Sequence, residues 1–199
     1  FQPYYNLMKL LRKDAVVSET ASWIFRATPY IAFISILIIA LLVPVLSSTV
    51  PANFTGDVIL IIYLFALGRF FLVLSSLDTG SAFGGMGGSR EMTISSMAEP
   101  AMMLSIFTVA IISGSTNLSN ITQAMLHYKV LSPSLLLALA ALAIVIIAET
   151  GRIPVDNPFT HLELTMIHEG MILEFSGRYL ALIEWASCMK LLILLTILV

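Results

Sequence analysis

Five long apolar stretches, each close to the thickness of a bilayer, constrain this 199-residue chain more than any other feature. An α-helix needs about 20 apolar residues to cross the hydrocarbon core of a membrane. Hydrophobic residues make up 58% of the chain and charged residues 11%, whereas soluble domains carry roughly 25% charged residues. The sequence therefore predicts an all-α integral membrane protein, a polytopic helical bundle with about five transmembrane helices at 25–46, 58–77, 92–113, 133–148 and 179–199. Because the chain starts at Phe1 and stops within the fifth stretch, we expect a fragment of a longer protein.

The first 22 residues form no span and are expected to be an interfacial amphipathic segment, followed by the transmembrane bundle over 23–199. Leucines recur at near-helical spacing there, with basic residues among them, as in helices that lie in the membrane interface. A solvated linker is the alternative interpretation. The single cysteine, Cys188, excludes an internal disulfide and a multi-cysteine metal or iron–sulfur site, so we predict no metal site. Without a basic patch, nucleic acid is not an expected partner.

Basic residues fall mainly on one side of the predicted membrane. That side holds the N-terminal segment and the loops at 78–92 and 149–178, and it carries Lys9, Arg12, Lys13, Arg26, Arg90, Arg152 and Arg178. The other side carries only Lys129. Because cytoplasmic loops are enriched in Lys and Arg, both loops are expected on the cytoplasmic side of the inner (cytoplasmic) membrane.

The segment 149–178 is the polar centre of the sequence. It joins two apolar stretches and contains five acidic residues, two histidines and two arginines. Gly151 and Pro154 should end the preceding helix, Asp156 or Asn157 could cap the next one, and that helix is predicted over 159–175. A zinc site is weakly supported, because HEGMI lacks the second histidine of an HExxH motif.

Several charges also fall inside the apolar stretches, where an ionisable residue usually has a function or a partner. Arg69 could pair with Asp78, Glu99 or a loop carboxylate. Glu99, beside Pro100, is either functional or a structural partner of Arg90 or Arg69. Glu184 and Lys190 should each find partners on other helices. The glycine-rich stretch 77–91 is predicted to be a close-packed loop, because it lacks the strand and the GKS/T ending of a phosphate-binding loop.

A relay of protonatable groups accounts best for these residues. Its predicted members are Glu99, Glu149, Glu163, Glu174, His161 and His168, and its predicted structural or charge partners are Arg69, Asp78, Arg90, Arg152, Asp156, Glu169, Glu184 and Lys190. A solvated acidic loop that docks a soluble partner remains the alternative for any one carboxylate. We predict no catalytic residue in this chain.

The run AETGRIPVDNP, followed by HLELTMIHEGMILEFSG, resembles a known family. It is similar to the membrane subunit of energy-converting [NiFe]-hydrogenases, including formate hydrogenlyase, and to its homologue in complex I (NADH:quinone oxidoreductase), subunit 1. The A-E-x-x-R-x-P-x-D core matches Ala148, Glu149, Arg152, Pro154 and Asp156, and E-F-S-G at 174–177 resembles the family's E-Y-x-G. LDTGSAFGGMGGSRE and QPYYNLMKLLRKD extend the resemblance over essentially the whole chain.

The resemblance implies a subunit of about eight transmembrane helices, of which the five here would be the second to sixth. Glu99, Glu149, Glu163 and Glu174 would be channel carboxylates, with Arg90 and Arg152 at the channel mouth. The chain would bind membrane lipid, the large and small iron–sulfur subunits of the hydrogenase, and antiporter-like subunits. The [NiFe] centre and iron–sulfur clusters would lie in those partners, and this chain would bind no cofactor.

Departures from the complex I pattern favour the hydrogenase branch. Val155 replaces the usual phenylalanine, about three residues are added, and His161 and His168 enter. The alternatives are a quinone-module subunit of a respiratory NADH:quinone oxidoreductase, in which quinone would bind near 149–178, and a secondary transporter. No internal repeat supports the transporter.

Overall fold

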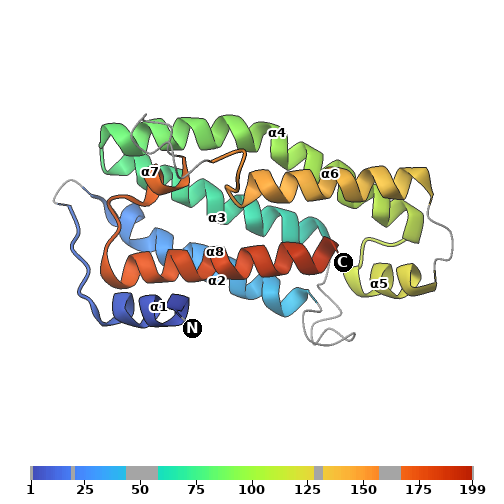
Figure 1. Ribbon diagram of the computed structural model, residues 1–199, viewed down its shortest axis with the longest axis horizontal. Helices are drawn as coiled ribbons and strands as arrows, with labels where there is room; N and C mark the ends of the chain where they lie inside the picture. Colours follow the sequence, from blue (N-terminus) through green and yellow to red (C-terminus); the bar gives the residue numbers. More distant parts are fainter. Residues whose placement is uncertain (1, 19–20, 44–57, 128–131, 157–166, 199) are drawn as a thin grey trace.

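The computed structural model describes residues 2–18, 21–43, 58–127, 132–156 and 167–198. In these ranges the chain forms helices and contains no strand. The helices lie side by side in an elongated bundle (Figure 1). Their bounds are α1 Gln2–Arg12, α2 Trp23–Leu42, α3 Val58–Asp78, α4 Ala82–Ser113, α5 Leu118–His127, α6 Pro133–Glu149, α7 His168–Ile172 and α8 Gly177–Leu198.

Four of these helices, α2, α3, α4 and α8, are long and apolar enough to cross a membrane. The fourth expected span corresponds to α6, an apolar helix of 17 residues. Apolar length thus predicted the all-α membrane fold correctly, because a backbone in lipid must satisfy its hydrogen bonds internally.

The glycine-rich stretch is helical, so the predicted loop at 78–92 is wrong in form. α4 begins at Ala82 after the N-cap Ser81, whose hydroxyl accepts a hydrogen bond from the Gly84 N–H at 3.1 Å. A Cβ placed on Gly84 would lie 2.5 Å from the Ser76 carbonyl oxygen, and one on Gly87 would lie 2.9 Å from that of Ile167. Glycine disfavours helices, but here its missing side chain lets α4 pack directly on α3 and α7.

The main apolar core lies between α2, α3, α4, α6 and α8 and includes Phe65, Met102 and Ile193. A smaller cluster at the start of α2 and α8 contains Phe25, Phe175 and Ile183. The rings of Phe25 and Phe175 are stacked with centroids 4.1 Å apart.

α6 ends inside the bundle, part of the way along its neighbours α4 and α8 (Figure 1). Its last residue, Glu149, accepts a hydrogen bond at its carbonyl from Lys190 Nζ at 3.1 Å. Lys190 lies roughly 20 Å along α8 from the start of that helix, at about 1.5 Å per residue. The chain leaves α6 through Gly151, whose φ is +57°. The end of α6 therefore brings polar backbone and charged side chains to the interior.

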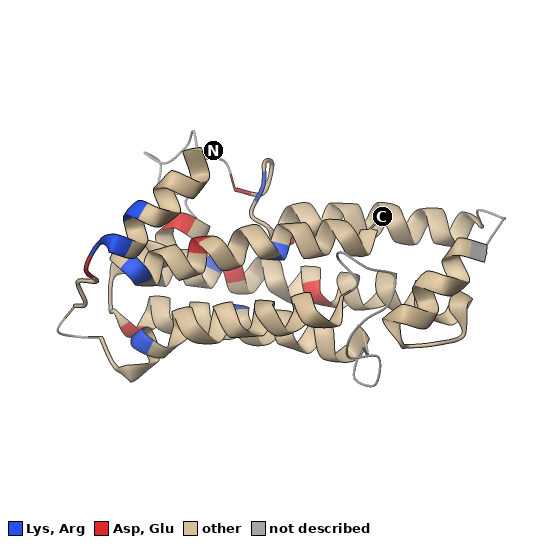
Figure 2. Cartoon of the chain, turned by 90° about the horizontal axis from the view of Figure 1, so that it is seen from below, with Lys and Arg blue, Asp and Glu red and all other residues tan. Residues whose placement is uncertain are grey.

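Of the helix predicted over 159–175, the structure describes only residues 167–175, and there the prediction is confirmed in part. α7 covers only His168–Ile172, and residues 173–176 form a turn before α8. Residues 157–166 lie outside the described part of the chain. The charged residues gather in the middle of the bundle and at one of its ends (Figure 2). That end contains α1 and the starts of α2, α4 and α8.

Candidate functional site

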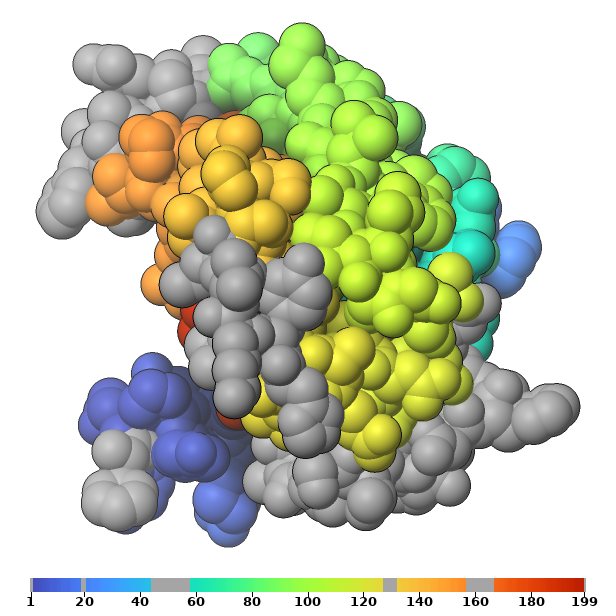
Figure 3. Space-filling view, turned by 90° about the vertical axis from the view of Figure 1, so that its right-hand side faces the viewer, coloured from blue at the N-terminus to red at the C-terminus, as the bar shows by residue number. Residues whose placement is uncertain are grey.

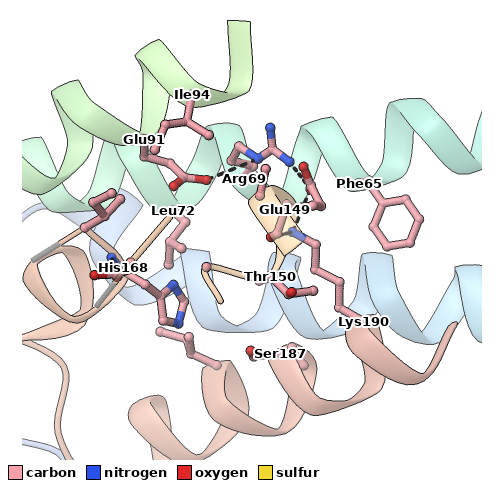
Figure 4. A pocket seen from close by; sticks show the side chains of 18 of the residues that line it. Phe65, Arg69, Leu72, Glu91, Ile94, Glu149, Thr150, His168, Ser187 and Lys190 are labelled. Carbon is pink, nitrogen blue, oxygen red and sulfur yellow. Dashed lines mark hydrogen bonds and ion pairs between the residues drawn. The ribbon is translucent and has the colours of Figure 1, made fainter. Parts of the chain in front are cut away.

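Arg69 on α3 is the centre of a buried group of charges. Its Nε lies 3.4 Å from Glu91 Oε1, and its Nη1 lies 3.1 Å from Glu99 Oε1, both carboxylates being on α4. Its Nη2 contacts Glu149 Oε1 at the end of α6. One buried guanidinium thus joins three carboxylates from two helices, and Figure 4 shows its contacts with Glu91 and Glu149.

Lys190 on α8 completes this group. Its Nζ lies 2.7 Å from Glu149 Oε1, the same oxygen that Arg69 contacts. Its second contact, with the Glu149 carbonyl, places a cation at the carboxyl end of α6, where the helix dipole favours positive charge. We call Arg69, Glu91, Glu99, Glu149 and Lys190 the buried charge cluster.

The buried charge cluster contains more carboxylates than cations. Three carboxylates face two cations, so the fully ionised cluster carries one net negative charge. The side chain of Glu149 is 1% exposed, whereas that of Glu99 is 36% exposed. The cluster thus connects the interior of the bundle with a half-exposed carboxylate on α4.

A cavity of about 90 Å³ adjoins the cluster and extends toward α7. It has room for a few water molecules. Glu91, Glu149, Asp156, His168 and Lys190 are among the residues that line it (Figure 4). Its polar walls come from α4, α6, α7, α8 and the segment after α6.

Asp156, in the segment after α6, and His168, the first residue of α7, both line the cavity. Asp156 Oδ2 accepts a hydrogen bond from the His168 backbone N–H at 3.1 Å, so this aspartate caps α7. Asp156 Oδ1 is buried and has no hydrogen-bond partner in the described part of the chain. Burial lowers the pKa of His168, the positive charge of Lys190 lowers it further, and Asp156 opposes both. Burial and Lys190 thus disfavour the protonated form of His168.

The structure thus brings Glu99, Glu149 and His168 of the predicted relay together with Arg69, Asp156 and Lys190. His161 and Glu163 lie outside the described residues. Glu174 is exposed in the turn before α8, away from the cavity lining.

The other predicted partners lie elsewhere. Asp78 binds Ser22, the N-cap residue of α2, rather than Arg69: its Oδ2 accepts hydrogen bonds from the Ser22 N–H and hydroxyl, both at 2.8 Å. Arg90 is half-buried on α4, and Glu184 is half-buried on α8. Arg152 and Glu169 are exposed.

Glu91 is not among the site residues predicted by number, although a loop carboxylate is one of the partners expected for Arg69. The glycines that precede Glu91 predict a loop, so the sequence does not indicate that Glu91 lies on a helix and faces Arg69. Its distance from Glu99, about two helical turns on one helix, is the available signal. In the ranges that the structure describes, no group of three or more His, Cys, Asp or Glu residues is arranged to hold a metal ion.

Comparison with known proteins agrees with this architecture. A family model described as NADH dehydrogenase matches residues 1–199. The chain is 39% identical to formate hydrogenlyase subunit 4 of Escherichia coli over 98% of its own length and 62% of that protein. It is 36% identical to hydrogenase-4 component C of the same organism, covering 96% of this chain and 59% of that one.

More distant relatives include an NADH-quinone oxidoreductase subunit of Rickettsia prowazekii, 30% identical over 89% of this chain and 55% of that protein. A chain in the structure of the membrane-bound sulfane sulfur reductase, an archaeal respiratory membrane complex, superimposes with a TM-score of 0.78 at 21% identity. That match covers 95% of this chain and 62% of the other, and it shows the fold.

The chain spans 55–62% of the length of these curated relatives. By their names, the relatives are subunits or components of a formate hydrogenlyase, a hydrogenase and an NADH-quinone oxidoreductase. Together with the four candidate spans, they identify a multi-pass membrane protein. Because the family model matches from the first residue to the last, this chain belongs to the NADH dehydrogenase subunit 1-like family.

Proposed function

We propose that this chain belongs to the membrane subunit of a complex I-like energy-converting hydrogenase, of the formate hydrogenlyase type. In this role it anchors a peripheral redox arm and couples electron transfer to the translocation of protons or sodium ions. The subunit itself is not catalytic. The relatives at 39% and 36% identity carry hydrogenase names, whereas the NADH-quinone oxidoreductase relative is 30% identical.

The observation that carries the proposal is the buried charge cluster. Charged groups inside a membrane bundle are costly and mark ion paths or proton relays. Glu149 contacts both Arg69 and Lys190. A change in its protonation would therefore change the electrostatic interaction with both cations. Asp156 and His168 lie on the side toward α7, and Glu99 lies on the half-exposed side of α4. The relay would run from the α7 side to Glu149 and on to Glu99, and Arg69, which stays protonated, would hold these two carboxylates in place.

The orientation follows from the distribution of charge. Lys and Arg residues gather toward the end of the bundle that contains α1 (Figure 2). Lys9 and Arg12 belong to α1, Lys13 directly follows it, and Arg178 is the second residue of α8. By the positive-inside rule, this end would face the cytoplasm, and we propose the inner membrane as the location of the chain. The redox arm would dock on this side, over 149–178.

The redox cofactors belong to the partners in this proposal. A nickel-binding large subunit and a small iron–sulfur subunit would carry the [NiFe] centre and the clusters, and antiporter-like membrane subunits would continue the ion path. The second candidate is the quinone-module subunit of a respiratory NADH:quinone oxidoreductase, supported by the relative at 30% identity. In that case quinone would bind beside 149–178.

The experiment measures electron transfer and ion translocation separately in membrane vesicles that contain the assembled complex. Glu149→Gln should abolish redox-driven ion uptake, because the amide cannot exchange a proton, while the redox arm still reduces an artificial acceptor. Asp14→Asn, which changes an exposed carboxylate after α1, serves as the matched control and should leave both activities unchanged.

Normal ion uptake by a correctly assembled Glu149→Gln complex would overturn the relay. Metal analysis of the purified complex decides the branch: nickel in the complex supports a hydrogenase, and its absence together with quinone-dependent NADH oxidation supports the second candidate. Substrate transport by the chain alone in liposomes would contradict both.

A further inference from the structure

α1 is an amphipathic helix, and most of its residues are exposed. Leu7 and Leu10 are half-buried against the rest of the molecule, whereas Tyr4, Met8 and Leu11 are 71%, 57% and 45% exposed. α1 projects from the body of the bundle in the space-filling view (Figure 3). Lys9 and Arg12 lie in the last turn of α1, Lys13 directly follows the helix, and all three are exposed. An apolar strip thus runs beside three exposed cations.

The turn before α8 holds the end of this helix in place. The Ser176 hydroxyl accepts a hydrogen bond from the Val16 N–H at 2.8 Å and donates one to the Val16 carbonyl at 3.0 Å. Gly177 has a φ of +54°, and a Cβ at that position would lie 2.5 Å from the Asp14 carbonyl oxygen. The backbone after α1 therefore rests directly on the first residue of α8, which only glycine permits.

These contacts fix the segment after α1 at the start of α8. Gly177 begins α8 and Trp23 begins α2, and both helices are candidate membrane spans. Phe175 stacks on Phe25 close to the same level, and Trp23 is exposed, as expected for an aromatic residue at the membrane surface. The segment that follows α1 is thus held at the starts of α2 and α8, where two candidate spans begin.

We propose that α1, fixed by the turn at 175–177, is a docking surface for anionic lipid headgroups. The exposed apolar strip would enter the acyl boundary, and the three cations would contact the phosphates. Charge complementarity selects this occupant, because a neutral headgroup offers no net charge to three adjacent cations. α1 would bind anionic lipid whether or not the buried charge cluster conducts ions.

The test uses the full-length protein in nanodiscs of phosphatidylcholine, with or without phosphatidylglycerol, and follows hydrogen exchange of the amides of α1. Each Lys or Arg near an anionic surface contributes about fivefold in affinity. Exchange in α1 should therefore slow by up to roughly a hundredfold when phosphatidylglycerol is present. The triple variant Lys9→Gln, Arg12→Gln, Lys13→Gln should lose this difference.

Two further variants separate charge from position. Arg152→Gln removes an exposed cation in the segment after α6, outside α1, and should retain the lipid dependence. Ser176→Ala removes the hydrogen bonds to Val16 without adding bulk and should release α1, so that its amides exchange faster in both lipids. Equal exchange with and without phosphatidylglycerol, or an unchanged lipid dependence in the triple variant, would overturn the proposal.

Discussion

Lys190 donates to both the carboxylate and the backbone carbonyl of Glu149, and so joins the middle of α8 to the last residue of α6. This contact explains how α6 can end inside the bundle. The last carbonyls of a helix lack intrahelical donors, and leaving them unpaired in an apolar interior is costly. The ammonium of Lys190 supplies a donor and a countercharge at one position. The stability of this junction and the proposed ion path therefore depend on the same residues.

Lys190→Met should destabilise the protein by about 3–5 kcal/mol, because removing one partner of a buried ion pair leaves the other incompletely compensated. Glu149→Leu should also destabilise it, and the double variant should be less destabilised than the sum of the two single variants. The free energy of unfolding, measured by SDS titration in mixed micelles, gives the interaction energy. Strictly additive effects would show that the two side chains do not interact.

Arg69→Lys should lower the free energy of unfolding by roughly 1–3 kcal/mol although the charge is kept. Arg69 meets its three carboxylates through three different nitrogens, and a single ammonium group cannot reproduce that planar fork. The same change at Arg26, which is exposed on α2, is the matched control and should shift stability by less than about 0.5 kcal/mol. Equal effects at both positions would contradict the geometry described for Arg69.

The fold could be predicted from the sequence because apolar length alone determines which segments cross a bilayer. Arg69, Glu99, Glu149 and Lys190 could be nominated because charges within such segments need partners. Their common meeting point could not be predicted. It depends on the rotation of α3, α4 and α6 about their axes and on their positions along those axes. Hydropathy predicts neither quantity.

The prediction for the glycine-rich stretch is wrong for a related reason. Local propensity counts each glycine against a helix, but the close approach of Ser76 and Ile167 to α4 is a tertiary contact that no local pattern contains. A loop over 77–91 gives Glu91 no helix face, so its place beside Arg69 could not be predicted. The termination of α6 near Gly151 is visible from the residue type, whereas the depth of that end in the bundle is not.

Gly87 and Gly85 on α4 offer a test of that packing. A Cβ on Gly87 would lie 2.9 Å from the Ile167 carbonyl oxygen and 3.1 Å from the Met171 N, whereas one on Gly85 meets nothing within 4 Å. Gly87→Ala should therefore displace α7 and destabilise the protein by about 1–3 kcal/mol. Gly85→Ala should stabilise it by about 0.5–1 kcal/mol, because alanine is the better helix former. Hydrogen exchange in α7 should rise only in the first variant, and a rise in both would refute the contact.

His168 should make stability depend on pH. Burial beside the cavity, with the positive charge of Lys190, lowers its pKa from the ordinary value of 6.5, against the opposing effect of Asp156. The unfolded chain then binds this proton more readily than the folded one, so stability should fall as pH falls below about 6.5, by at most about 1.4 kcal/mol per pH unit, until the folded pKa is reached. His168→Gln removes this contribution, and other titrating groups cancel in the comparison because both proteins share them. We would measure the free energy of unfolding of both proteins from pH 7.5 to pH 5. It should fall more steeply for the wild type than for the variant as the pH falls. Parallel curves would contradict a lowered pKa of His168 in the folded protein.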